Sequence, residues 1–222
     1  MKNCENPWGY SRVVGEWYLE VFGGKSDDLK GRFRILIDIL ERSNDALKKL
    51  HTLHEVSASI SLLGDEILAD GTIKEEQYLE LIPIDCQSLE DLVTLIKNRV
   101  KPYSKFLITT IFIDLNTSII EKDREIILPN SANLYIGAGD YALINEKTEL
   151  YLSYTTGTNV WLKNVWSNDY KILLDNSEAS NFNLPRLRKF LETLENNLRV
   201  NINPGESHLY GKYLDKTGFI FD

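Results

Sequence analysis

The chain has 222 residues, of which 43% are hydrophobic and 26% are charged, and its formal net charge is −8. This length supports one large domain or two small ones with a sizeable buried core. The acidic balance argues against nucleic acid and anionic lipid as partners, because both carry negative charge themselves.

The sequence also bears on the compartment. The longest apolar run, Phe106 to Ile113, is much shorter than the roughly 20 residues of a membrane helix. The N-terminus lacks the apolar stretch of a signal peptide. Two cysteines, Cys4 and Cys86, are too few for a disulfide framework. We therefore expect a cytoplasmic protein without a membrane partner.

The N-terminal quarter predicts two helices. Aromatic residues and valines at helical spacing indicate a short helix from Pro7 to Phe22, with a strand as the alternative. Ser26 and two following aspartates are typical of a helix start. Apolar residues at steps of three and four then predict a long amphipathic helix from Leu29 to about Leu53.

The next region changes period. Polar and apolar residues alternate from Glu55 to Leu62, which predicts a strand with one solvent-exposed face. Further antiparallel strands are expected at Glu66 to Leu68 and Ile73 to Ile84. A second helix is predicted from Ser88 to Lys101, because Ser88 and Asp91 resemble a capping box and an apolar stripe follows.

The C-terminal half predicts strands and a final helix. Phe106 to Leu115 is apolar on both faces, which indicates a central strand buried on both sides. Short runs separated by turn residues predict an antiparallel meander. Its strands are expected at Ile126 to Leu128, Leu134 to Ile136, Tyr141 to Ile144, Glu149 to Thr155, Val160 to Leu162 and Tyr170 to Leu174. A last helix is predicted from Asn183 to Leu198, and Gly218 to Phe221 is a candidate added strand.

Together these elements predict an α+β fold. We expect mostly antiparallel sheet with three to four helices, including a long N-terminal helix and a C-terminal helix. No linker divides the sequence, so a single α+β domain over residues 1–222 is expected, with two lobes, 1–128 and 129–222, as the alternative.

The most informative feature is a segment from Glu55 to Asp91. It contains ten carboxylates against one base, Lys74, so its net charge is −9 and the rest of the chain sums to about +1. A surface that only had to keep the protein dissolved would mix both signs. Concentrated negative charge instead attracts a basic partner over a distance.

This pattern predicts a protein-binding module that inhibits or neutralises a basic protein partner, such as a toxin or nuclease, as immunity-type proteins do. The residues expected to make the contact are Asp65, Glu66, Asp70, Glu75, Glu76 and Glu80, with Tyr78 as an aromatic anchor. We expect no catalytic residues, no cofactor and no metal, and the sequence leaves the oligomeric state open.

Two other functions remain as alternatives. One is a hydrolase that uses a carboxylate pair, or a metal held by His51 and His54 with His208 or Glu206. The other is a structural subunit of a larger assembly. Its interface would use aromatic residues of the C-terminal half: Tyr151, Tyr154, Trp161, Trp166 and Tyr170.

Two further motifs have simple interpretations. Gly137-Ala138-Gly139 matches part of a dinucleotide-binding turn, but a strand rather than a helix is expected after it, so we interpret it as a glycine hairpin. Arg186, Arg188 and Lys189 are expected near the start of the last helix, as a solvated face or as a contact for an acidic group.

Overall fold

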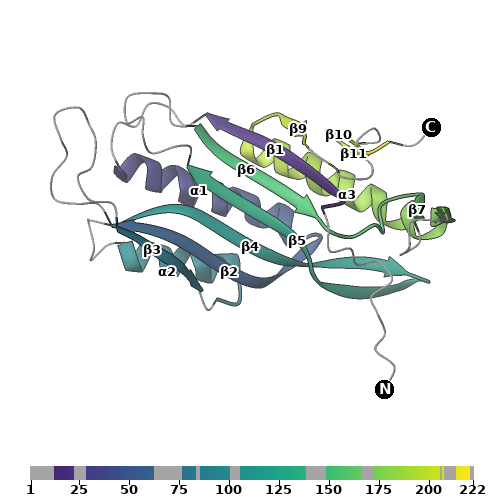
Figure 1. The fold of residues 1–222 in the computed structure, drawn as a ribbon, viewed down its shortest axis with the longest axis horizontal. Coiled ribbons are helices and arrows are strands. Elements are labelled where there is room, and N and C mark those ends of the chain that lie inside the picture. Colours follow the sequence, from purple (N-terminus) through teal and green to yellow (C-terminus); the bar gives the residue numbers. More distant parts are fainter. Residues whose placement is uncertain are drawn as a thin grey trace, which may run out of the picture.

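The computed structural model describes residues 13–22, 29–62, 77–83, 86–100, 106–138, 149–166, 173–205, 207 and 214–220. In this part of the chain, three helices accompany a seven-stranded sheet in which every pairing is antiparallel (Figure 1). The fold is therefore α+β, with mostly antiparallel sheet, as the sequence predicts.

The sheet has the strand order β3-β2-β4-β5-β6-β1-β9. Its strands are β1 (Gly15–Phe22), β2 (His51–Leu62), β3 (Gln77–Pro83), β4 (Phe106–Glu121), β5 (Arg124–Ala138), β6 (Glu149–Thr156) and β9 (Ile202–Pro204). The helices are α1 (Leu29–Leu47), α2 (Leu89–Val100) and α3 (Ser177–Leu198). Two small ribbons pair β7 (Asn164–Trp166) with β8 (Leu173–Asp175), and β10 (Leu214–Asp215) with β11 (Gly218–Phe219).

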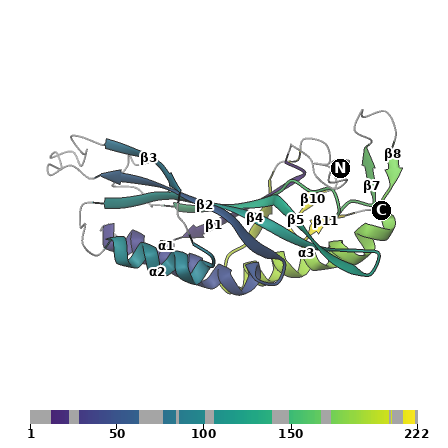
Figure 2. The same ribbon diagram turned by 90° about the horizontal axis from the view of Figure 1, so that it is seen from below.

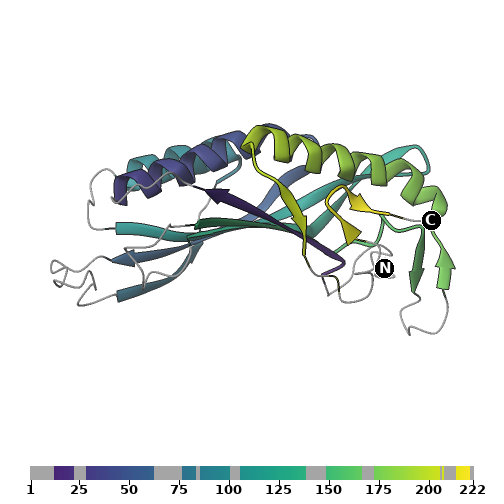
Figure 3. The same ribbon diagram turned by 90° about the horizontal axis from the view of Figure 1, so that it is seen from above.

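All three helices lie on the same side of the large sheet, so the molecule has two layers (Figures 2 and 3). The β7–β8 ribbon projects at one end of the sheet, on the side away from the helices. No described helix covers the rest of that side. We call this surface, which faces away from the helices, the open face.

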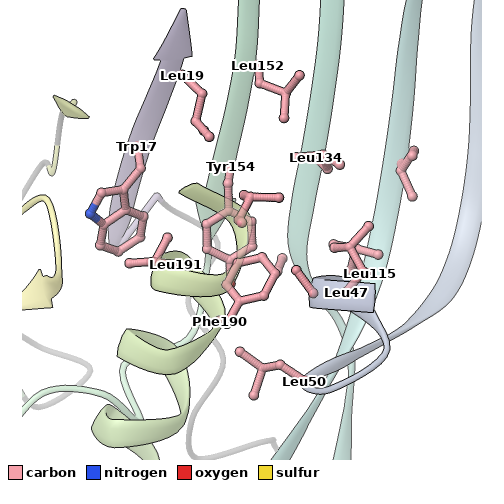
Figure 4. Close-up of a cluster of buried hydrophobic side chains, with 14 of the residues drawn as sticks. Trp17, Leu19, Leu47, Leu50, Leu115, Leu134, Leu152, Tyr154, Phe190 and Leu191 are labelled. Carbon is pink, nitrogen blue, oxygen red and sulfur yellow. The ribbon is translucent and has the colours of Figure 1, made fainter. Parts of the chain in front are cut away.

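The core lies between the sheet and the helices. Alternate residues of β1 and β5 point into it: Trp17 and Leu19 on β1 are fully buried, and so are Leu134 and Ile136 on β5. From the helical side, α3 supplies Phe190 and other apolar residues (Figure 4). This arrangement buries one face of an antiparallel sheet, and none of the described helices packs on the other face.

The side chain of a histidine lies inside this core. His51, the first residue of β2, is buried between β4, β6 and α3. Its ring nitrogens lie 3.3 Å from the Thr117 hydroxyl and 3.1 Å from the Tyr154 hydroxyl, and its ring meets Phe190 edge-on at 5.0 Å. Desolvation by this burial lowers the pKa of His51 from 6.5 to about 3, so the ring is neutral near pH 7.

The N-terminal predictions are partly wrong. Residues 15–22, expected in a helix, form strand β1, because Trp17 and Leu19 alternate with outward-facing residues in the two-residue period of a strand. The long helix predicted to reach Leu53 ends at Leu47. The chain turns at residues 48–50 and enters β2 at His51, so Leu53 belongs to a strand and not to the helix.

The prediction for the last helix is wrong at its start. α3 begins at Ser177, six residues before the expected cap, and Asn183 lies in its interior. The Asn183 amide instead bonds both the N–H and the C=O of Ile120 on β4, at 2.8 Å each. Helix and sheet are thereby joined by a side chain that the sequence pattern assigned to capping.

Three strand predictions also need correction. β4 is central, but it is not buried on both sides, because Phe112 on the open face is 38% exposed. Residues 124–138, expected as two strands, form the single strand β5, which continues through Pro129. Val160 to Leu162 is a turn, and the neighbouring strand is β7. The expected strands at Glu66 to Leu68 and Tyr141 to Ile144 lie outside the described residues.

Candidate functional site

The predicted contact residues fall almost entirely outside the described part of the chain. This applies to Asp65, Glu66, Asp70, Glu75 and Glu76. Tyr78 and Glu80 belong to strand β3, at one edge of the sheet, and their side chains lie outside the description. Their role in binding therefore remains a prediction.

Three other carboxylates of the acidic segment are described, and they occupy both layers. Glu55 is exposed on β2, whereas Glu90 and Asp91 are exposed on helix α2. Glu90 accepts hydrogen bonds from Lys48 and Asn44, which lower its pKa to about 2. The segment is thus not one uninterrupted patch, and one of its charges is already paired.

A clearer charge asymmetry divides the two layers. Counting lysine and arginine, the seven strands of the large sheet contain a single base, Arg124, at the start of β5. The same strands contain eight carboxylates: Glu16, Glu20, Glu55, Glu80, Asp114, Glu121, Glu125 and Glu149. The sheet is therefore strongly acidic.

The helices have a different charge pattern, with both signs mixed and several charges paired. Lys97 of α2 binds Glu41 of α1 at 2.7 Å, and Arg42 binds Asp38 within α1 at 2.9 Å. Lys48, just after α1, pairs with Glu90 of α2. Exposed pairs of this kind add little stability, but they leave the helical layer without a strong field of one sign.

Five polar side chains form a row across the open face, which we call the acidic row. The strand register places them side by side on five neighbouring strands, in the order Glu16, Thr155, Asn133, Asp114 and Glu55. With strands about 4.8 Å apart, the row is about 19 Å long. It has a carboxylate at one end and two adjacent carboxylates at the other.

The two adjacent carboxylates are in an unfavourable arrangement. Glu55 on β2 lies directly opposite Asp114 on β4, and like charges in this position destabilise a sheet. The Asn133 amide donates to Asp114 Oδ1 at 3.3 Å. Within the described residues, neither carboxylate forms an ion pair with a base. The pair therefore offers two negative groups to a cation from outside.

A second row, the aromatic row, lies beside the acidic row on the same face. Its members, again in register, are Tyr18, Ser153, Tyr135, Phe112 and Ser57. Two residues along each strand separate the rows, which is a distance of about 7 Å. Tyr18 donates to Glu16 Oε2 at 2.7 Å, so the two rows are connected at the β1 end.

The middle of the aromatic row is an edge-to-face pair. The rings of Phe112 and Tyr135 are 5.0 Å apart at an angle of 60°. The Tyr135 side chain leans along β5 over Gly137, so closely that a Cβ on that glycine would lie 2.4 Å from the Tyr135 hydroxyl. Glycine thus lets the Tyr135 ring lie flat over β5, on the side of Tyr135 that is away from Asn133.

The histidine-based metal hypothesis is not supported. His51 is buried in the core and both of its nitrogens have hydroxyl partners, whereas His54 is exposed. The two histidines lie on a strand, not on one face of a helix. No cluster of three metal-ligating side chains occurs among the residues described. His208 and Glu206 lie outside that part.

The basic residues of α3 have structural contacts. Arg186 donates to the Ser118 carbonyl and hydroxyl at 3.0 Å and lies 3.5 Å from Glu125. Arg188 donates to the Phe219 carbonyl at 2.7 Å. These residues lie in the middle of the helix, not at its start, and they fasten it to the sheet and to β11.

The aromatic residues of the C-terminal half, expected as an interface in a larger assembly, also have structural contacts where they are described. Tyr154 and Trp161 are fully buried, and Trp166 is partly buried against the core. The Tyr151 side chain and Tyr170 lie outside the description. The described members thus contribute to the core, which weakens the case for an interface built from them.

Sequence reasoning missed the acidic and aromatic rows. The sequence shows the polar residues of each strand separately, and the rows appear only when the register brings five strands together. The available signal was the scarcity of lysine and arginine in the strand segments.

Comparison with known proteins adds no relative. The chain matches no protein-family model, and no curated protein or solved structure is significantly similar to it. None of the described helices is both long and apolar enough to cross a lipid bilayer.

Proposed function

We propose that this chain is an acidic protein-binding module that inhibits or neutralises a basic protein in the cytoplasm, as immunity-type proteins do. One observation carries the proposal: the large sheet has eight carboxylates and one base, while the helices mix both signs. A basic partner gains from this asymmetry, because the sheet attracts it before contact. Glu16, Asp114 and Glu55 then offer it negative groups on the open face.

Charge also decides between candidate occupants of the open face. A second copy of the chain would bring Glu16, Glu55 and Asp114 against the same carboxylates, and like-charge contacts of this kind cost several kcal/mol. Nucleic acid and anionic lipid are repelled for the same reason. A positively charged protein is the occupant whose charge complements this face.

The predicted contact residues have a place in this proposal. The segment that links β2 to β3 contains Asp65, Asp70 and Glu75, and it starts at the strand that carries Glu55. We propose that these carboxylates also contact the basic partner. In a nuclease inhibited in this way, these carboxylates would occupy the positions in the active-site cleft that bind the phosphates of the substrate.

The first test is a binding measurement with a labelled octalysine peptide as the cationic probe, followed by fluorescence anisotropy at low and high salt. The decisive variant combines Glu55→Gln with Asp114→Asn. We expect it to weaken binding about tenfold at low ionic strength, because each removed charge contributes on the order of 0.7 kcal/mol. The affinity of the unmodified protein should fall steeply with added salt.

A matched control removes the same charge from the other layer. Asp45→Asn with Glu178→Gln neutralises two exposed carboxylates on α1 and α3, and it should change the affinity less than twofold. If both double variants weaken binding equally, the peptide responds only to net charge and the open face is not the site.

Stability provides an independent check on the same variant. Relief of the repulsion between Glu55 and Asp114 should raise the free energy of unfolding by about 0.2–1 kcal/mol. Weaker binding by a more stable protein cannot result from unfolding.

A further inference from the structure

We infer that the groups recognised at the centre of the open face are arginine side chains of the partner, stacked on Phe112 and Tyr135 and bonded to Asp114 and Glu55. This inference rests on the proposed function and specifies the chemistry of the partner. Its basis is that an aromatic pair on β4 and β5 and a carboxylate pair on β4 and β2 meet on β4, where Phe112 and Asp114 are two residues apart.

The geometry joins the two pairs. On β4, Phe112 and Asp114 are separated by one residue whose side chain is buried in the core, so both project from the open face. On β2, Ser57 lies opposite Phe112 and Glu55 lies opposite Asp114. Along β4, Asp114 lies two residues from Phe112, or about 7 Å, and Glu55 is the diagonal neighbour of Phe112 at about 7–8 Å. A flat cation over the Phe112 ring is therefore near both carboxylates.

The surroundings of this site favour a cation that is also planar. Phe112 is 38% exposed and its ring is held by the edge-to-face contact with Tyr135. Asn133 occupies one side of Asp114, at Oδ1, and Glu55 is exposed beside it. The site therefore offers an apolar ring on one side and oxygen acceptors on the other.

Arginine matches both halves of this site, whereas lysine matches one. A guanidinium group is planar, stacks on aromatic rings and donates two parallel hydrogen bonds to carboxylates. An ammonium group is compact and strongly hydrated, so it gains from the carboxylates but loses hydration over a ring. Phe112 should accordingly discriminate between the two bases.

The experiment compares octa-arginine and octalysine peptides, which have equal length and charge, on the intact chain. The test variant is Phe112→Leu, which keeps an apolar side chain and removes the ring. We expect the affinity for octa-arginine to fall about three- to fivefold and the affinity for octalysine to fall less than twofold. The matched control is Phe182→Leu on α3, where the ring is 47% exposed in the other layer, and it should alter neither affinity.

The outcomes separate this inference from the proposed function. Equal losses for both peptides in Phe112→Leu, or no loss for either, would overturn the arginine assignment. The proposed function would still stand if Glu55→Gln with Asp114→Asn weakened both peptides. If that double variant weakened neither peptide, the open face would not be a cation-binding surface and both proposals would fail.

Discussion

Replacement of His51 should change how the stability of this protein depends on pH. The imidazole is buried against Tyr154, Thr117 and Phe190, and desolvation by this burial lowers its pKa to about 3. In the unfolded chain the same ring has the ordinary value of 6.5. Below that pH the unfolded chain binds a proton that the folded protein does not bind, and stability falls.

The magnitude follows from these two pKa values. The folded pKa is depressed, so stability from neutral His51 is complete above pH 6.5 and is lost progressively down to about pH 3. Over that whole range the loss is about 5 kcal/mol, at 1.36 kcal/mol for each pKa unit. Between pH 7 and pH 5, His51 alone should lower the free energy of unfolding by about 2 kcal/mol.

Urea unfolding at pH 7 and pH 5 measures this loss. The interval contains the ordinary pKa of histidine and lies above the ordinary pKa values of aspartate and glutamate, so it reports mainly on histidine. His51→Gln should unfold more easily at pH 7, because it loses core contacts, but its stability should fall about 2 kcal/mol less between the two pH values than that of the unmodified protein. The control His54→Gln, at an exposed position on the same strand, should keep the original pH dependence. An equal fall in His51→Gln and the unmodified protein would refute the reasoning.

Two further predictions concern stability. Asn183→Ala should lower the free energy of unfolding by about 2 kcal/mol, because it leaves the N–H and C=O of Ile120 without their partner. The control Asn181→Ala, at an exposed site on the same helix, should leave the free energy of unfolding unchanged. Asp123→Gly should raise the free energy of unfolding by about 1 kcal/mol, because Lys122 and Asp123 both have positive φ values in the β4–β5 turn, a conformation that glycine adopts without strain. Thermal and urea unfolding would check both, and a destabilised Asp123→Gly variant would show that the Asp123 side chain has a favourable role in the turn.

The sequence was sufficient where a local pattern and its tertiary setting agree. Helix α2 begins next to the predicted cap, and the Ser88 hydroxyl accepts the Asp91 N–H at 3.1 Å. The alternation of polar and apolar residues from Glu55 to Leu62 predicted strand β2. The apolar stripe of α3 from Leu184 to Leu198 is buried as predicted. Each of these predictions uses contacts within a few residues, which the order of residues along the chain determines directly.

The sequence was insufficient where a residue satisfies more than one pattern. Val14, Trp17 and Val21 fit a helix by spacing, whereas Trp17 and Leu19 fit a strand by alternation. Pairing of β1 with β6 and β9 decided for the strand. Asn183 fits a helix cap by residue type, yet its amide binds the backbone of β4. Long-range pairing outweighed local preference in both cases, because buried backbone groups must find partners.

For the candidate site, the sequence by itself determined that the chain is acidic and that its strand segments contain almost no lysine or arginine. Only the tertiary structure decided that Glu16, Asp114 and Glu55, which are far apart in sequence, lie in one row on the side away from the helices. The physical reason is register. The alternation of a strand fixes which residues share a face, but hydrogen bonding between distant strands fixes which of them are neighbours.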